Sequence, residues 1–143
     1  MKKVTSKMNE QLNQWIKDGF TARQLYEVAL GFEKGLTMEQ VKIIASSGLN
    51  CSQMRKVRKY FEEDYTVEQV QIIVNPEFSC GQMDEIMKCF KYHDFTIEQS
   101  KMCADPRFST SQMQAIRFRI RDGHTIEQLK EYIDSFMFEW ANL

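Results

Sequence analysis

The sequence predicts an all-α protein, specifically an α-solenoid of about four and a half antiparallel helix hairpins that ends in a longer capping helix. Three observations favour this fold. Two helix-capping motifs recur every 29 or 30 residues along nearly all of the 143-residue chain. Apolar residues follow at helical spacing, at i, i+3 and i+7 in the longer helices and at i, i+3 and i+4 in the shorter ones. Proline or glycine then follows at the distance expected for the end of a short helix.

The first motif, T-x-E-Q, marks the start of a short helix in each hairpin. Threonine is a good N-cap, glutamine three residues later completes a capping box, and glutamate meets the positive end of the helix dipole. The motif begins at Thr37, Thr66, Thr96 and Thr125. In the first copy Met8 replaces the threonine and Gln11 occupies the glutamine position, so we expect the first helix to start near Met8.

The second motif starts a longer helix, with a Thr, Asn or Ser cap, a Gln three residues later and an apolar staple residue before the cap. The caps are Thr21, Asn50, Ser79 and Ser109, and the glutamines are Gln24, Gln53, Gln82 and Gln112. Asn75-Pro76 and Asp105-Pro106 end two short helices, whereas Lys34-Gly35 and Asp122-Gly123 end two long ones. These signals predict short helices of about nine residues and long helices of about thirteen.

We expect one helical-repeat domain over residues 1–143. Its copies are predicted at about 8–36, 37–65, 66–95 and 96–124, with a half copy at 125–143. A hairpin of this size cannot bury its apolar stripe alone, so successive hairpins should stack. The half copy has no second cap and predicts one longer terminal helix. Its apolar face comprises Leu129, Tyr132, Ile133, Phe136, Met137 and Trp140.

The composition is that of a globular protein whose net charge is too small to create a strong electrostatic field. Hydrophobic residues make up 43% of the chain, charged residues 27%, and the net charge is −1. A near-neutral chain is not drawn as a whole to nucleic acid or to an anionic membrane. No apolar run approaches the roughly 20 residues of a membrane span, and no secretory signal is recognisable. We therefore expect a cytoplasmic protein with reduced cysteines and no membrane partner.

Neither catalysis nor metal binding is predicted. The sequence has no nucleophile elbow, phosphate-binding glycine loop or histidine-rich helix, so we expect no enzyme activity and no cofactor. Cys51 and Cys80 follow two helix caps, and Cys103 replaces a core residue and should be buried. Without a C-x-x-C pair the cysteines do not have the spacing of a structural zinc site, and we expect no metal.

The repeat pattern resembles a known class of helical repeats. T-x-E-Q-V followed by Q-M-x-x-I-R, with Gln112-Met113-Gln114-Ala115-Ile116-Arg117 as its closest copy, is similar to repeats in proteins of Gram-positive gut bacteria, their phages and mobile elements. The resemblance covers almost the whole chain and rests on structural residues. It implies accessory or regulatory binding, including modulation of a host defence protein such as a CRISPR effector. It carries over no functional residue.

Charge placement supplies the only candidate binding residues, on the long helices. They are Arg55, Lys56, Arg58, Lys59, Lys88, Arg117, Arg119 and Arg121, together with Phe138 as an aromatic anchor on the last helix. Because Arg55, Arg58, Lys59, Arg117 and Arg121 avoid the apolar stripe, we expect them to be exposed.

Two functions fit these residues. One is a non-catalytic protein-binding module, as a monomer or as a homodimer through a solenoid end. The other is an RNA- or DNA-binding repeat that uses a basic helix face. A third interpretation assigns no function to the charges, which would form a solvated face offset by nearby acids such as Glu62 and Asp122.

Overall fold

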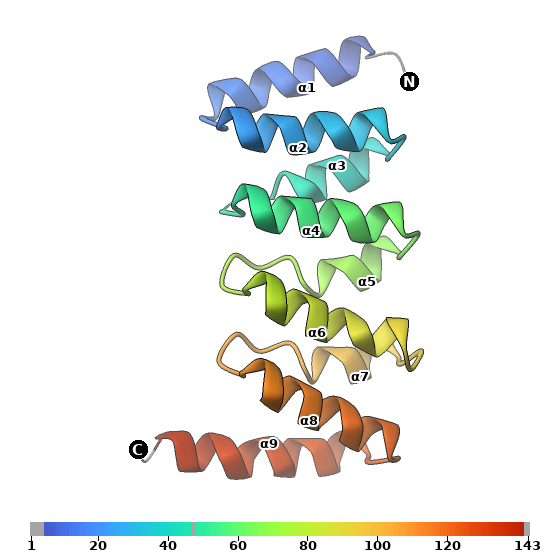
Figure 1. Ribbon diagram of the computed structural model, residues 1–143, viewed down its shortest axis with the longest axis vertical. Coiled ribbons are helices and arrows are strands. Elements are labelled where there is room, and N and C mark those ends of the chain that lie inside the picture. Colours follow the sequence, from blue (N-terminus) through green and yellow to red (C-terminus); the bar gives the residue numbers. More distant parts are fainter. Residues whose placement is uncertain (1–4, 47, 142–143) are drawn as a thin grey trace. The chain divides into compact units, whose positions relative to one another are not determined.

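The computed structural model describes residues 5–46 and 48–141, with side chains as far as Met137. These residues form nine helices and no strand, which confirms the all-α prediction (Figure 1). The chain divides into two compact units, Met1–Cys80 and Gly81–Leu143. Each unit is described by itself below, and a single continuous solenoid stays a prediction.

The first unit holds two long helices that lie side by side. These are α2 (Ala22–Glu33) and α4 (Cys51–Glu62), and α3 (Met38–Ile44) packs against both (Figure 1). α1 (Ser6–Lys17) packs on α2, and α5 (Val67–Gln71) packs on α4. The buried core of these helices includes Val28, Val41, Ile44, Met54 and Val57, at the predicted stripe positions.

The second unit repeats the alternation of long and short helices. It contains α6 (Cys80–Lys91), α7 (Ile97–Lys101), α8 (Thr110–Arg121) and α9 (Ile126–Ala141). The sixteen residues of α9 confirm the longer terminal helix. Its Leu129 is fully buried, whereas the side chain of Trp140, predicted on the same face, lies outside the described residues.

The first helix begins earlier than the sequence predicted. Thr5, not Met8, is the N-cap of α1. The Thr5 N–H donates to the sulfur of Met8 at 3.4 Å, so this methionine takes the place that glutamine holds in the other boxes. Gln11 therefore lies within the helix and is not a capping residue, because a threonine six positions upstream already supplies the cap.

Three of the short helices are shorter than the nine residues expected, and the first is longer. α3 has seven residues and α5 and α7 have five each, whereas α1 has twelve, as many as each of the helices α2, α4, α6 and α8. After α5 the backbone tightens into i→i+3 hydrogen bonds, from the Ile72 N–H to Gln69 and from the Ile73 N–H to Val70. This tightening satisfies the last carbonyls ahead of Pro76, whose ring excludes a helical residue before it.

The ends of the long helices confirm the glycine signals and extend them. Gly35 and Gly123 have φ of 87° and 93°, the left-handed conformation that closes a helix. The equivalent residues of the other two copies are Asp64 and Asp94, with φ of 68° and 52°. Aspartate is among the few residues with a side chain that adopt this region.

Three of the four capping glutamines of the long helices have a second role. In α4 the Gln53 Oε1 accepts from the Asn50 N–H at 2.8 Å, as the capping box requires. Its amide nitrogen also donates to the carbonyls of Pro76 and Phe78, at 2.9 and 2.8 Å. Gln24 and Gln82 make the corresponding bonds to the carbonyls of Leu49 and Phe108. One side chain thus caps its own helix and holds the turn before the next long helix.

Candidate interaction surface

The nine candidate residues are distributed over both units. Arg55, Lys56, Arg58 and Lys59 lie on α4 in the first unit. Lys88 lies on α6, and Arg117, Arg119 and Arg121 lie on α8, all in the second unit. Phe138 belongs to α9, but its side chain lies outside the described residues.

In the first unit two of these arginines converge on one buried carboxylate. Glu27 of α2 is 1% exposed; its Oε1 accepts from Arg55 Nε at 3.0 Å and its Oε2 from Arg58 Nε at 2.9 Å. The Nη1 of Arg58 also donates to Glu62 at 2.9 Å. The Arg58 side chain is only 8% exposed, so the prediction that it is exposed is wrong. It points toward α2 because a buried acid there binds it.

The second unit contains a similar but looser cluster around Glu85. Lys88 donates to Glu85 Oε1 at 2.7 Å, and Arg117 Nη2 donates to Oε2 at 3.4 Å. Arg117 Nη1 lies 3.0 Å from Nε2 of His93. Arg117 is buried, which makes the prediction of its exposure wrong as well. Its charge is taken up by Glu85 inside the unit.

The two clusters occupy equivalent repeat positions. Glu27 and Glu85 each lie three residues after a capping glutamine, and Arg58 and Arg117 each lie five residues after the capping glutamine of the following copy. Between the second and third copies neither partner is present, because Lys56 occupies the position of the acid and Met87 that of the arginine. Four of the eight basic candidates, Arg55, Arg58, Lys88 and Arg117, therefore belong to ion-pair clusters within the two units.

The remaining arginines of α8 contact neighbouring aromatic rings. The guanidinium of Arg119 lies 3.7 Å from the ring centroid of Tyr132, which places it in cation–π contact. Arg121 lies over Phe118 at 4.5 Å and pairs with Asp122 at 3.1 Å. These contacts orient both side chains along the surface of the second unit.

The first unit presents a tyrosine beside cations on its outer surface. Tyr26 of α2 is 59% exposed and Arg55 of α4 is 51% exposed. The pKa of Arg55 is raised by its hydrogen bond to Glu27 and, more weakly, by the nearby Tyr26. Arg23 and Lys59 are exposed on the same two helices. We term Arg23, Tyr26, Arg55 and Lys59 the Tyr26–Arg55 face.

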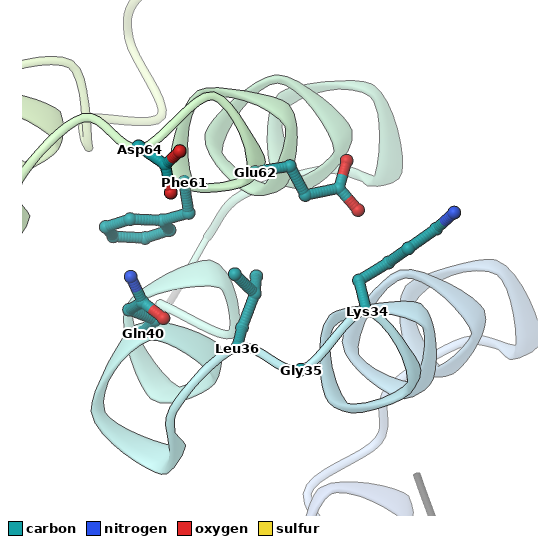
Figure 2. Close-up of a pocket in the computed structure, with 7 residues that line it drawn as sticks. All are labelled: Lys34, Gly35, Leu36, Gln40, Phe61, Glu62 and Asp64. Carbon is teal, nitrogen blue, oxygen red and sulfur yellow. The ribbon is translucent and has the colours of Figure 1, made fainter. Parts of the chain in front are cut away.

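The same unit also has a hollow of about 470 Å³ at the ends of its long helices (Figure 2). Leu36 and Phe61 supply its apolar part, and Figure 2 shows Gln40 and Phe61 on facing sides. Charged groups of both signs surround it, from Lys34, Glu62 and Asp64. Because Glu62 is already bound to Arg58, the hollow adjoins the ion-pair cluster of α2 and α4.

The chain has no match in comparisons with protein-family models, curated proteins or solved structures. No described helix has the length and apolarity needed to cross a bilayer. Among the described side chains, no three from His, Cys, Asp and Glu gather as a metal site would require. The four cysteines are free thiols, and Cys103 is buried as predicted.

Sequence reasoning missed Tyr26, Glu27 and Glu85. A usable signal exists for Tyr26, which lies two residues after its capping glutamine, as Arg55 does, and outside the apolar stripe. For the glutamates the signal is a charge complement between successive copies. An acid three residues after one glutamine faces an arginine five residues after the next, in both clusters.

The cluster of the second unit should make stability depend on pH. His93 stacks on Phe95 at 4.8 Å, and its pKa is lowered by burial and then by the charges of Arg117 and Arg121. The folded state therefore favours neutral His93. Its contribution is complete above the unfolded pKa of about 6.5 and is lost as pH falls from there toward the lower folded pKa.

A His93→Gln variant tests this dependence. The free energy of unfolding, measured by urea titration at about pH 7.5 and about pH 5, should fall more for the wild type than for the variant. The pKa of Asp105 is also lowered, by Arg107, but this group is unchanged in both proteins and cancels. An equal fall in the two proteins would show that His93 does not titrate in this way.

Proposed function

We propose that the chain is a non-catalytic protein-binding helical-repeat module, and that the Tyr26–Arg55 face receives a carboxylate-bearing surface of its partner. The observation behind this proposal is an exposed tyrosine beside a half-exposed arginine whose Nε is held by a buried glutamate. Tyrosine and arginine are the residues most often found at binding hot spots. An arginine already fixed at one end loses less conformational entropy on binding.

The alternative, a nucleic-acid-binding repeat, has weaker support. Arg58 and Arg117 are two of the eight basic candidates for phosphate contacts, and both are buried against carboxylates. Glu27 also places negative charge beside Arg55, and Glu62 places it beside Arg58. A phosphate backbone would meet these acids together with the cations, which lowers the electrostatic gain that drives such binding.

The burial of each arginine decides which variants can test a binding role. Reversing the charge of Arg58 would bury a carboxylate beside Glu27 and unfold the unit rather than report on binding. The suitable combination is Tyr26→Ala with Lys59→Glu, because both side chains are exposed. The matched control is Tyr92→Ala with Lys42→Glu, which changes an exposed tyrosine and an exposed lysine elsewhere.

The experiment compares tagged wild type, face variant and control in affinity purification from the organism that carries the gene, with and without nuclease. We expect a protein that the wild type and the control retain and the face variant loses at least about tenfold, corresponding to loss of about 1.4 kcal/mol of binding energy. Equal retention by all three proteins would exclude this face.

Nucleic-acid binding has its own readout. Purified chain is titrated with single- and double-stranded oligonucleotides at several salt concentrations. Affinity that falls steeply with salt, together with nuclease-sensitive retention, would replace the protein-binding proposal with the nucleic-acid alternative. The identity of the retained protein tests the role in host-defence modulation that the repeat resemblance implies.

A further inference from the structure

Two buried thiols touch in the second unit, apart from the candidate surface. Cys89 lies on α6 and Cys103 follows the end of α7; their sulfurs are 3.7 Å apart and neither residue is exposed to solvent. We propose that this pair is an oxidative modification site, at which a hydroperoxide converts the two thiols into an intramolecular disulfide.

The repeat explains why the two sulfurs meet. Cys89 lies seven residues after its capping glutamine, at the position of Gly31 in the first copy, and Cys103 holds the position of Ile44. A Cβ built on Gly31 would lie 3.4 Å from the Ile44 Cδ1 atom, so this position brings a long helix close to its short partner. The two sulfurs, 3.7 Å apart, must close to about 2.05 Å to form the S–S bond.

Core packing alone does not account for the two cysteines. The other copies place Gly31 with Ile44, Tyr60 with Ile73 and Arg119 with Tyr132 at these positions. Many combinations of side chains are therefore compatible with the repeat, and only this copy has a thiol at either position. Having thiols at both, in contact, provides the geometry for coupling them.

The surroundings distinguish the two sulfurs. The pKa of Cys89 is lowered, first by a hydrogen bond with Cys103 and also by Ser100 and the charge of Arg117. The pKa of Cys103 is raised, by its hydrogen bond with Cys89 and by burial. The attack is assigned to Cys89 and the second step to Cys103, because the Cys103 sulfur has a further partner for its proton, the Met113 carbonyl at 3.8 Å.

The chemistry balances with a hydroperoxide as the oxidant. The Cys89 thiolate attacks the terminal peroxide oxygen, the O–O bond breaks, and an alcohol or water leaves as a sulfenic acid forms. The sulfur of Cys103 then attacks the sulfenic sulfur, the S–S bond forms and the S–O bond breaks. The departing hydroxide and the Cys103 proton form water. Two thiols and one peroxide give one disulfide, one alcohol or water, and one water.

Access to the buried pair requires only a local opening. α7 has five residues, and Cys103 lies in the turn that follows it. Short elements of this kind open more readily than the core helices. The disulfide would then tie α6 to the segment after α7 and restrict that opening.

The test uses the full chain with Cys51→Ser and Cys80→Ser, which leaves only the proposed pair. The reduced folded protein is treated with hydrogen peroxide, freed of peroxide with catalase, and unfolded in the presence of N-ethylmaleimide. We expect both thiols to escape labelling, the intact mass to lose two hydrogen atoms, and one peptide to link Cys89 with Cys103. The midpoint temperature of thermal unfolding should rise by roughly 5–10 °C on oxidation and return to that of the reduced protein after dithiothreitol.

Two controls make the outcome decisive. In the same background, Cys103→Ala should leave Cys89 unlinked, and peroxide should not raise the melting temperature of this variant. The wild-type chain should form the same linked peptide with Cys51 and Cys80 still labelled. Full labelling of both cysteines after peroxide, a linkage formed only in denaturant, or a disulfide only between chains would each overturn the proposal.

Discussion

Replacing Glu27 with alanine is expected to destabilise the first unit by about 3 kcal/mol or more, because removing one partner of a buried ion pair leaves the other charge uncompensated. Glu27 accepts from two arginines, and Arg58 is almost as buried as Glu27 itself. Glu62 remains as a partner of Arg58, which keeps the loss toward the lower end of the usual range. Urea titration followed by circular dichroism measures the change.

Two further variants separate this effect from a general loss of side chain. Glu33→Ala removes an exposed acid from the same helix and should change stability by no more than about 0.5 kcal/mol. Glu85→Ala removes the corresponding acid of the second unit. Because Glu85 is 14% exposed and lies 3.4 Å from Arg117, its loss should cost less than the loss of Glu27. Stability of Glu27→Ala equal to that of Glu33→Ala would contradict the role given to Glu27.

A double substitution asks what the buried charges provide. Glu27→Leu with Arg58→Met replaces the pair with apolar side chains of similar length. Such replacements are often neutral or stabilising, because the cost of burying both charges disappears together with their attraction. We expect the double variant to be much more stable than Glu27→Ala. This result would assign the pair to fixing the contact between α2 and α4 rather than to overall stability.

The contrast between helix starts and ion pairs shows what the sequence could predict. Capping boxes are local, since cap and glutamine lie three residues apart, and bonds such as that from the Asn50 N–H to Gln53 follow directly. Glu27 and Arg58 are 31 residues apart and meet only because two long helices pack with particular flanks opposed. An arginine that avoids the apolar stripe was predicted to be exposed, but the groove between neighbouring helices also buries the stripe's flanks.

The start of α1 illustrates the same limit at close range. The sequence matched Met8 and Gln11 to the repeat because spacing was the only guide. The structure uses Thr5 and the sulfur of Met8 instead, since a better cap was available upstream. A repeat register predicts which residues are equivalent, but the local hydrogen bonds decide which of them caps the helix.

Replacing Gln53 with glutamate is expected to cost about 2–4 kcal/mol, although glutamate suits a capping box as well as glutamine does. The carboxylate can still accept from the Asn50 N–H. It cannot donate to the carbonyls of Pro76 and Phe78, which the amide nitrogen now satisfies at 2.9 and 2.8 Å. Two acceptors lose their donor in a buried site, and a negative charge is placed against them.

Gln112→Glu is the matched control, because the described contacts of Gln112 are those of its capping box with Ser109. That variant should have nearly the stability of the wild type, since the positive end of the helix dipole stabilises a carboxylate in the first turn. Gln24→Glu should lie between the two, as Gln24 donates to one carbonyl, that of Leu49, at 3.0 Å. The order Gln53, Gln24, Gln112 in the free energy of unfolding would show that these glutamines join one copy to the next. Equal losses of unfolding free energy at all three positions would show that these glutamines act only as helix caps. The coupling between copies would then rest on apolar packing alone.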